Sequence, residues 1–309
     1  MTTTDITFGA IATAWLDEKR QLVKRSTYCA YLLTVKTHLL PTFATSHTIT
    51  ETRAQAFVLE KLSDGLSRKS VHDILAVLKA ILKYGARHHH GQAPDWDITF
   101  PTSTEHRRLP VLSLTDHRRL LRHLTDEPTA KNIGILLALC TGMRIGEVCA
   151  LCWSDINFPR RVITVWRTAG RVYNIDNRQT ERILSSPKTR SSNREIPISG
   201  VLYSALRAVQ KHSAGQYVVG DGTQAADPRT YREYFTRLLH RLGIPHIVFH
   251  GLRHTFATRC IESQCDYKTV SAILGHSNIA TTLNLYVHPD IAQKKRCIDR
   301  MNRALGQHS

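Results

Sequence analysis

The stretch LGHSNIATTLNLYVH, residues 274–288, is the part of the sequence from which the fold can be worked out. Its two threonines and two asparagines make it an indifferent helix former, and it has neither the strict alternation of a strand nor a clean apolar face. Packing therefore gives no reason for His276 or for Tyr286, which follows it by ten positions. A chemical reason is indicated, so we searched the rest of the chain for residues with which these two could act.

Three further islands carry cationic or nucleophilic side chains: TGMRIGE (141–147), SPKTRSSNREIPI (186–198) and FHGLRHT (249–255). The candidates in them are Arg144, Lys188, His250 and Arg253. Taken singly, each has an ordinary interpretation as a surface charge, a solvated turn residue or a structurally satisfied histidine. The information lies in their order along the chain.

In that order the islands resemble the tyrosine recombinase family, the phage-type integrases and their Xer-like relatives. The family pattern is Arg, then Lys in a β-hairpin, then His-x-x-Arg, then Leu-Gly-His, then Tyr. This chain supplies Arg144, Lys188, His250, Arg253, His276 and Tyr286, and the resemblance covers residues 111–290. It implies a site-specific recombinase that cleaves and rejoins DNA through a 3′-phosphotyrosine intermediate.

The chemistry of that reaction explains the residue types. Breaking a DNA phosphodiester without a metal requires a nucleophile, a proton donor for the leaving 5′ oxygen and fixed positive charge around the phosphoryl oxygens. Tyr286 suits the first role, and the forked guanidiniums of Arg144 and Arg253 suit the third. We expect no cofactor and no metal. The nearest competing tyrosine, Tyr267, precedes the Leu-Gly-His.

The remaining roles follow from the resemblance. It implies that Lys188, on a flexible hairpin, delivers the proton to the leaving oxygen, as a lysine of lowered pKa can do. His250 is expected to serve as acid or base for the tyrosine hydroxyl and His276 as a phosphate hydrogen-bond donor, but the sequence does not separate the two. Glu147 matches an acidic position that steadies the site, and an ordinary helix ion pair with Arg144 is the alternative.

Composition indicates the same kind of partner. Lys and Arg number 42 against 25 Asp and Glu, a formal net charge of +17, which is typical of proteins that bind polyanions. With 42% hydrophobic residues and a length of 309, the chain is predicted to be globular with two domains.

The predicted first domain spans residues 1–105. Apolar residues at helical spacing indicate four helices. The first starts near Phe8 and the second is closed by Pro41. The third runs from Thr50 to Gly65 and the fourth from Ser67 to about Tyr84. A proline-containing linker follows. By its pattern of helices this part resembles the family's SAM-like domain, a core-site DNA-binding domain.

The predicted second domain, residues 106–309, is an α+β catalytic domain, so the chain as a whole is mainly α with a small β-sheet. A helix capped by Thr115, a very apolar helix ending at Gly142 and a helix bearing Arg144 come first. Residues 161–168 and 194–199 alternate as strands, and the rest is mostly helical.

Cysteine usage and the chain start bear on location. The seven cysteines lack a disulfide-framework spacing, no apolar run reaches membrane-spanning length, and no signal peptide is evident. We expect a cytoplasmic, nucleoid-associated protein with no membrane partner. Cys149 and Cys152 read as buried small hydrophobes, and the run His88–His90 as a solvated helix end.

The expected biological role is integration and excision of a phage or other mobile element, because a His-to-Tyr spacing of ten resembles phage and conjugative-element integrases. With a first helix near Phe8, we expect no arm-site-binding domain of the kind that many phage-type integrases carry. Alternatives are a DNA invertase, an Xer-like dimer resolvase, a type IB topoisomerase, or a DNA-binding module that has lost catalysis.

The expected partners are double-stranded DNA with inverted-repeat core sites and further copies of this chain. Residues 289–309 form an amphipathic tail, whose apolar positions are Ile291, Ile298, Met301 and Leu305. The resemblance implies a C-terminal segment passed cyclically between four protomers, so we predict that the tail docks in trans in a synaptic tetramer, anchored by Ile298 and Leu305. An accessory directionality factor is left open.

Overall fold

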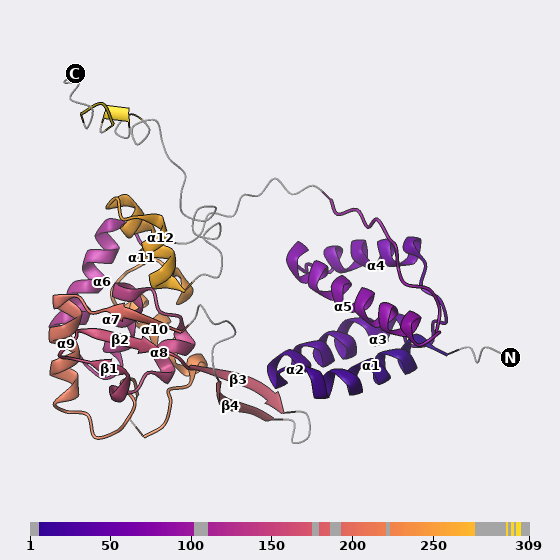
Figure 1. Ribbon diagram of the computed structural model, residues 1–309, viewed down its shortest axis with the longest axis horizontal. Coiled ribbons are helices and arrows are strands. Elements are labelled where there is room, and N and C mark those ends of the chain that lie inside the picture. The colour runs from indigo at the N-terminus through magenta and orange to yellow at the C-terminus, as the bar shows by residue number, and fades with distance from the viewer. Residues whose placement is uncertain are drawn as a thin grey trace. The chain divides into compact units, whose positions relative to one another are not determined.

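The computed structural model describes residues 6–101, 111–174, 179–185, 193–220 and 223–275, together with residues 295, 298, 299 and 301–303. The chain divides into two compact units (Figure 1). Unit 1 comprises residues 1–106 with 172–181, and unit 2 comprises residues 107–171 with 182–309. The predicted domain boundary at 105–106 falls outside the described residues. Each unit is described by itself.

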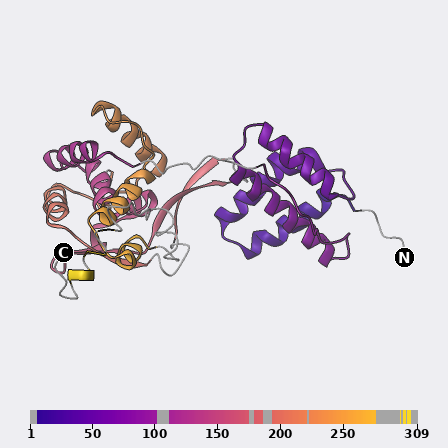
Figure 2. The same cartoon turned by 90° about the horizontal axis from the view of Figure 1, so that it is seen from above.

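Residues 6–101 of unit 1 form helices and the segments that connect them, as their sequence pattern predicts (Figure 2). The helices are α1 (Phe8–Leu22), α2 (Arg25–Thr34), the π-helix η1 (Val35–Leu39), α3 (Leu40–Phe43), α4 (Glu51–Ser63) and α5 (Arg68–Arg87). The side chains of Thr7, Thr50 and Ser67 each accept a hydrogen bond from a main-chain N–H three residues ahead, which fixes the starts of α1, α4 and α5.

The prediction that Pro41 closes the second helix is wrong. The chain stays helical through η1 and α3 as far as Phe43. A π-turn at Val35–Leu39 widens the helix just before the proline, so the ring and the missing N–H of Pro41 are accommodated in the first turn of α3. The inner faces of these helices bury one apolar cluster, in which the rings of Phe43 and Phe57 lie 5.0 Å apart.

Unit 2 combines helices with one small sheet and part of a second, whose residues 172–181 belong to unit 1. Its helices are α6 (Leu114–Asp126), α7 (Asn132–Thr141), α8 (Ile145–Ala150), the 3₁₀ turn η2 (Trp153–Asp155), α9 (Gly200–Gln210), α10 (Pro228–Arg241), α11 (His250–Glu262) and α12 (Tyr267–Leu274). The cap of α6 is Ser113, not the predicted Thr115, because the Ser113 hydroxyl accepts the N–H of Asp116. The predicted class, mainly α with a small β-sheet, is confirmed.

The first sheet has the order β1 (Ile156–Asn157), β2 (Val162–Val165) and β5 (Arg194–Pro197), all antiparallel, with Ile163 opposite Ile196. A second, two-stranded sheet pairs β3 (Thr168–Asn174) with β4 (Gln179–Ser185). The predicted strand over 161–168 therefore ends early, at Val165, and Thr168 opens the separate hairpin. That hairpin was not predicted, since its strands show little alternation of apolar and polar residues.

Helix α7 forms the centre of unit 2. All of its residues except Cys140 are buried, and it packs against α6, α8, α9 and α11. A helix that is apolar on every side belongs in the middle of a core. None of the helices in the described ranges is both long and apolar enough to cross a membrane.

Candidate active site

Arg144 and Glu147 form the first pair of the site. Gly142 ends α7 in the left-handed conformation, with φ of 67°, and Arg144 is the N-cap of the helix that follows, α8. One oxygen of Glu147 accepts the main-chain N–H of Arg144 and the other accepts its Nη1, both at 2.9 Å. The Glu147 side chain is 3% exposed and that of Arg144 is 37% exposed. The pair therefore buries the carboxylate and leaves the guanidinium accessible.

Arg194 completes the environment of Glu147 and was not singled out from the sequence. Its Nη1 and Nη2 donate to the two carboxylate oxygens at 3.2 and 2.9 Å, and its side chain is only 6% exposed. A signal did exist. Arg194 opens β5 two positions before the buried Ile196, and residues two apart lie on the same face of a strand. An arginine on the inward face of a strand needs buried acceptors, and a carboxylate such as that of Glu147 is a suitable one.

Arg253, on α11, is also buried, with 1% of its surface exposed. Its Nη1 donates to the carbonyl oxygen of Gly142 at 2.9 Å and its Nη2 to that of Leu274 at 2.7 Å. Both carbonyls lie where a helix ends, α7 in one case and α12 in the other. The last carbonyls of a helix lack partners within it and carry partial negative charge, so a buried cation is stabilised between them.

The end of α12 is a meeting point for three arginines. Arg194 Nε donates to the carbonyl oxygen of Ile273 at 2.6 Å, Arg253 donates to that of Leu274, and Arg144 Nη2 lies 3.5 Å from that of Gly275. Three elements distant in the sequence thus converge on three consecutive carbonyls, immediately before His276.

The positive charges of the arginines near the end of α12 outnumber the one negative charge of Glu147 among the described residues of this cluster. Burial by itself raises the pKa of Glu147, but hydrogen bonds and charge from Arg194, followed by those from Arg144, outweigh burial and lower that pKa. The carboxylate is therefore ionised at neutral pH. Among the described residues of this cluster, Glu147 pairs with Arg144 and Arg194, and the third guanidinium, that of Arg253, lies against helix-end carbonyls instead. The remaining positive charge suits the binding of a phosphoryl group.

Two histidines on α11 adjoin the arginines. The rings of His250 and His254 lie 4.7 Å apart, edge to face. His250 retains exposed surface, yet desolvation, followed by the charges of Arg253 and Arg144, lowers its pKa. Burial, with His250 and Arg253 nearby, lowers the pKa of His254 to about 4. Both rings are neutral at pH 7, so each can accept as well as donate a proton. His254 was not singled out from the sequence, although it lies one helical turn from His250.

Lys188, His276 and Tyr286 lie outside the described residues. The structure accordingly brings together four of the seven predicted site residues, Arg144, Glu147, His250 and Arg253, and adds Arg194 and His254. Tyr267, the competing tyrosine, is the first residue of α12 and is 39% exposed.

The other features noted in the sequence stand apart from this cluster. Cys149 and Cys152 are buried as predicted, and burial raises the pKa of the Cys149 thiol to about 12. His88–His90 are exposed and follow α5, which ends at Arg87. Within the described ranges, no group of three His, Cys, Asp or Glu side chains could hold a metal ion.

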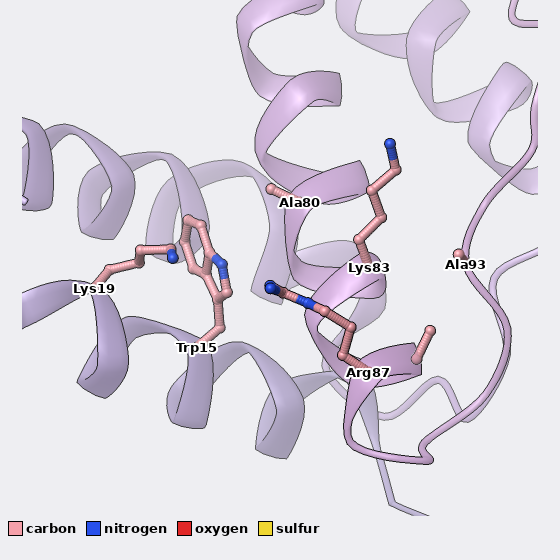
Figure 3. Close-up of a pocket in the computed structure, with 7 residues that line it drawn as sticks. Trp15, Lys19, Ala80, Lys83, Arg87 and Ala93 are labelled. Atoms are coloured by element: carbon pink, nitrogen blue, oxygen red, sulfur yellow. The ribbon is translucent and has the colours of Figure 1, made fainter. Parts of the chain in front are cut away.

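Unit 1 carries a pocket of about 540 Å³ between α1 and α5. Figure 3 shows Lys19 and Arg87 directed toward the indole of Trp15, while Lys83, also on α5, extends away from it. Trp15 is 2% exposed, and the Lys19 ammonium lies 5.9 Å from the centre of its ring. An apolar floor with cations at its rim can receive an anionic group.

Comparison with known proteins agrees with the motifs. A model of the phage integrase family matches residues 110–293, more than half of the chain. The chain belongs to this family of tyrosine recombinases, enzymes that cleave and rejoin DNA. The resemblance drawn from the four islands is therefore confirmed.

Two curated relatives illustrate the range of the family. A tyrosine recombinase XerC-like protein of Caldanaerobacter subterraneus subsp. tengcongensis is 34% identical over 54% of this chain and 48% of its own length. The transposase from transposon Tn916 of Enterococcus faecalis is 25% identical over 81% of this chain and 66% of its own length. The chain thus spans about half of the first relative and two thirds of the second.

Solved structures show the fold. The integrase of transposon Tn1549, in complex with transposon right end DNA, has a TM-score of 0.81 at 22% identity, covering 96% of this chain and 99% of that one. A lambda integrase tetramer bound to a Holliday junction has a TM-score of 0.68 at 18% identity, covering 94% and 80%. The chain has the fold of these integrases.

Proposed function

We propose that this chain is a site-specific recombinase that cleaves and rejoins double-stranded DNA through a 3′-phosphotyrosine at Tyr286, and that it integrates and excises a mobile element. The observation that carries the proposal is the convergence of Arg144, Arg194 and Arg253 on the end of α12. The segment that follows directly contains His276 and Tyr286.

Each residue has a proposed role. Arg144, with its accessible guanidinium, binds a non-bridging phosphate oxygen, and Arg253 places a second positive charge beside it. Neutral His250 takes the proton of the tyrosine hydroxyl. By resemblance to the family, Lys188 protonates the leaving 5′ oxygen and His276 donates a hydrogen bond to the phosphate. Glu147 holds Arg144.

The mobile-element role is supported by the likeness to a Tn916 transposase and to the fold of a Tn1549 integrase. A second role, dimer resolution, is favoured by the likeness to XerC-like proteins. The DNA sites discriminate the two, because a mobile-element enzyme should recombine inverted-repeat core sites found at the element's ends. Relaxation of a supercoiled plasmid that lacks such sites would indicate topoisomerase activity instead.

The proposed assembly is a synaptic tetramer on DNA, as in the lambda integrase structure bound to a Holliday junction. The tail is proposed to dock in trans. In its described part, Ile298 and Met301 leave 57% and 55% of their surface exposed, which supports an apolar face awaiting a partner. Leu305, the second proposed anchor, lies outside the described residues. A chain truncated after Asp290 should bind single sites and fail to join paired ones. The proposed location is the cytoplasm, in association with the nucleoid. The direction of recombination is proposed to be set by the DNA sites or by an accessory factor.

The decisive experiment uses a nicked suicide substrate, on which cleavage traps the covalent adduct. The wild-type chain should form the adduct, and Tyr286→Phe should bind the same DNA without forming it. The matched control is Tyr267→Phe, which should form the adduct normally. An adduct that survives Tyr286→Phe, or that is lost in Tyr267→Phe, would show that the nucleophile is misassigned.

The same assay tests the expected independence of metal, since arginines are proposed to supply the positive charge that two metal ions supply in many nucleases. Adduct formation should proceed unchanged in EDTA. Loss of the adduct in EDTA and its recovery on adding magnesium would contradict the proposed chemistry.

A further inference from the structure

We propose that Arg194 is a positioning residue of the recombination reaction, which fixes the orientation of Arg144 through Glu147 and ties it to the end of α12. The inference rests on the proposed function. It concerns a buried residue that the mechanism above does not use, and it follows from how the donors around Glu147 are distributed.

The two oxygens of Glu147 are each shared. Oε1 accepts Arg144 Nη1 at 2.9 Å and Arg194 Nη1 at 3.2 Å. Oε2 accepts the main-chain N–H of Arg144 at 2.9 Å and Arg194 Nη2 at 2.9 Å. A guanidinium that engages both oxygens of a carboxylate sets the plane of that carboxylate. Arg194 therefore determines the direction from which Arg144 can reach Glu147.

Exposure separates the roles of the two arginines. The Arg194 side chain is 6% exposed and cannot present its guanidinium to DNA in this arrangement, whereas that of Arg144 is 37% exposed. A buried carboxylate needs its hydrogen bonds satisfied. With Arg194 in place, Arg144 supplies one side-chain donor to Glu147. Without it, Arg144 would be the cation left on Glu147 among the described residues, and it would be drawn fully onto the carboxylate, away from the phosphate.

Arg194 also joins segments that must work together. Its Nε donates to the carbonyl oxygen of Ile273 at 2.6 Å, three residues before His276. It opens β5, six positions after Lys188. One side chain thus connects the strand that follows the lysine island, the helix that begins at Arg144 and the helix end that leads toward the nucleophile. A lysine at this position would carry the charge but could not make this set of bonds.

The test compares Arg194→Lys with the double variant Glu147→Gln/Arg194→Gln. The double variant removes both buried charges together, which guards against a misfolded single variant. The matched control is Glu195→Gln, the neighbouring residue on β5, whose ion pair with Arg160 is on the surface with side chains 49% and 64% exposed. Thermal unfolding, affinity for a single core site and the single-turnover rate of adduct formation at saturating protein are measured for each.

We expect Arg194→Lys and the double variant to fold and to bind DNA like the wild type, but to form the adduct about 100-fold more slowly, the loss typical of a misplaced catalytic group. Glu195→Gln should match the wild type throughout. In Arg194→Lys the fall in rate on the acid side should begin at a higher pH, because Arg194 is the group that most lowers the pKa of Glu147. A merely structural role would not move that profile.

The outcomes are distinct. A wild-type chain that forms no adduct would refute the proposed function and the role of Arg194 with it. A wild-type chain that forms the adduct, beside an Arg194→Lys variant with the same rate and the same pH profile, would overturn the positioning role alone. The same holds if the double variant cleaves at the wild-type rate, since the two charges would then do no more than neutralise each other.

Discussion

Arg253 donates a hydrogen bond from Nη1 to the carbonyl oxygen of Gly142, 2.9 Å away, and so joins α11 to the end of α7. Its Nη2 makes the corresponding bond to Leu274 at the end of α12. A guanidinium has five N–H donors, and these two bonds take two of them. Arg253 is therefore part of the framework of unit 2 as well as a proposed source of charge for the reaction. Arg144 makes one contact of this kind, from Nη2 to the carbonyl oxygen of Gly275 at 3.5 Å.

The first prediction separates these two arginines by stability. Arg253→Ala leaves two buried carbonyls without their partner and should lower the free energy of unfolding by about 3–5 kcal/mol. Arg144→Ala removes a partly exposed side chain and leaves Glu147 with Arg194, so the loss should be about 1 kcal/mol. Urea unfolding of the DNA-free chain measures both. Equal losses would mean that the bonds at the two helix ends contribute little.

Much of the fold could be predicted from the sequence, because the ends of several helices are set by single residues at those ends. Thr50 and Ser67 set the starts of α4 and α5, and Gly142 sets the end of α7. Capping and the left-handed turn depend on the residue itself, so these helix ends can be predicted from the sequence. The order of the four islands identified the family. What could not be predicted depends on distant partners.

Arg194 shows why. In the sequence it is one of several cations in the island 186–198, and only the fold brings Glu147 and Ile273 to it, 47 and 79 positions away. The hairpin β3–β4 was missed because neither strand alternates cleanly, so its pairing depends on main-chain hydrogen bonds rather than on a pattern of apolar side chains. His254 was missed because its burial, and hence its low pKa, follows from packing.

The second prediction concerns Gly146, in α8 between Arg144 and Glu147. Helix propensity alone favours Gly146→Ala by up to about 1 kcal/mol. Here, however, an added Cβ would lie 2.5 Å from the main-chain oxygen of Ala169 and would overlap the Thr168 hydroxyl. Main chain cannot move aside as a flexible side chain can, so α8 must shift. We expect a net destabilisation of about 1–3 kcal/mol and slower adduct formation.

Gly200 is the matched control for that substitution. It also lies in a helix, at the start of α9, and an added Cβ there meets nothing within 4 Å. Gly200→Ala should change the free energy of unfolding by less than about 0.5 kcal/mol. A Gly146→Ala chain as stable as Gly200→Ala would show that the close approach of α8 to β3 is not needed.

The third prediction is a loss of stability in acid. The pKa of His254 is about 4 in the folded chain against 6.5 for a free histidine, so the unfolded state binds a proton between these pH values and the folded state does not. Stability should therefore fall as the pH is lowered from 6.5 to 4. Glu147, whose folded pKa is lowered, contributes stability above its unfolded pKa of 4.5 that is lost as the pH falls further.

Urea unfolding at several pH values between 7 and 4 would measure this dependence. His254→Asn removes the titrating ring, so the variant should lose less stability over that range than the wild type, whatever its stability at pH 7. The other histidines are common to both chains and cancel in the comparison. Parallel pH dependences of the two chains would contradict a buried, neutral His254.

The fourth prediction tests whether the pocket of unit 1 contacts DNA. Lys83 and Arg87 are exposed and line the pocket, and Arg87 is directed toward Trp15 (Figure 3). If each neutralises one phosphate, binding releases condensed counterions, and the wild-type affinity for a core site should fall steeply as salt is raised. Lys83→Gln/Arg87→Gln should weaken binding at low salt and reduce the slope of log affinity against log salt by about 2, roughly one for each contact.

The control for this pair is Lys61→Gln. Lys61 belongs to the same unit, but its ammonium lies 2.8 Å from a carboxylate oxygen of Glu60 and 2.9 Å from one of Asp64, and its side chain is 15% exposed. A cation already held by two carboxylates has little charge to offer to DNA, so this variant should keep the wild-type slope. If the Lys83→Gln/Arg87→Gln chain also kept that slope while binding normally, the rim of the pocket would not face the phosphates, and the contacts of unit 1 with DNA would have to be sought on another of its faces.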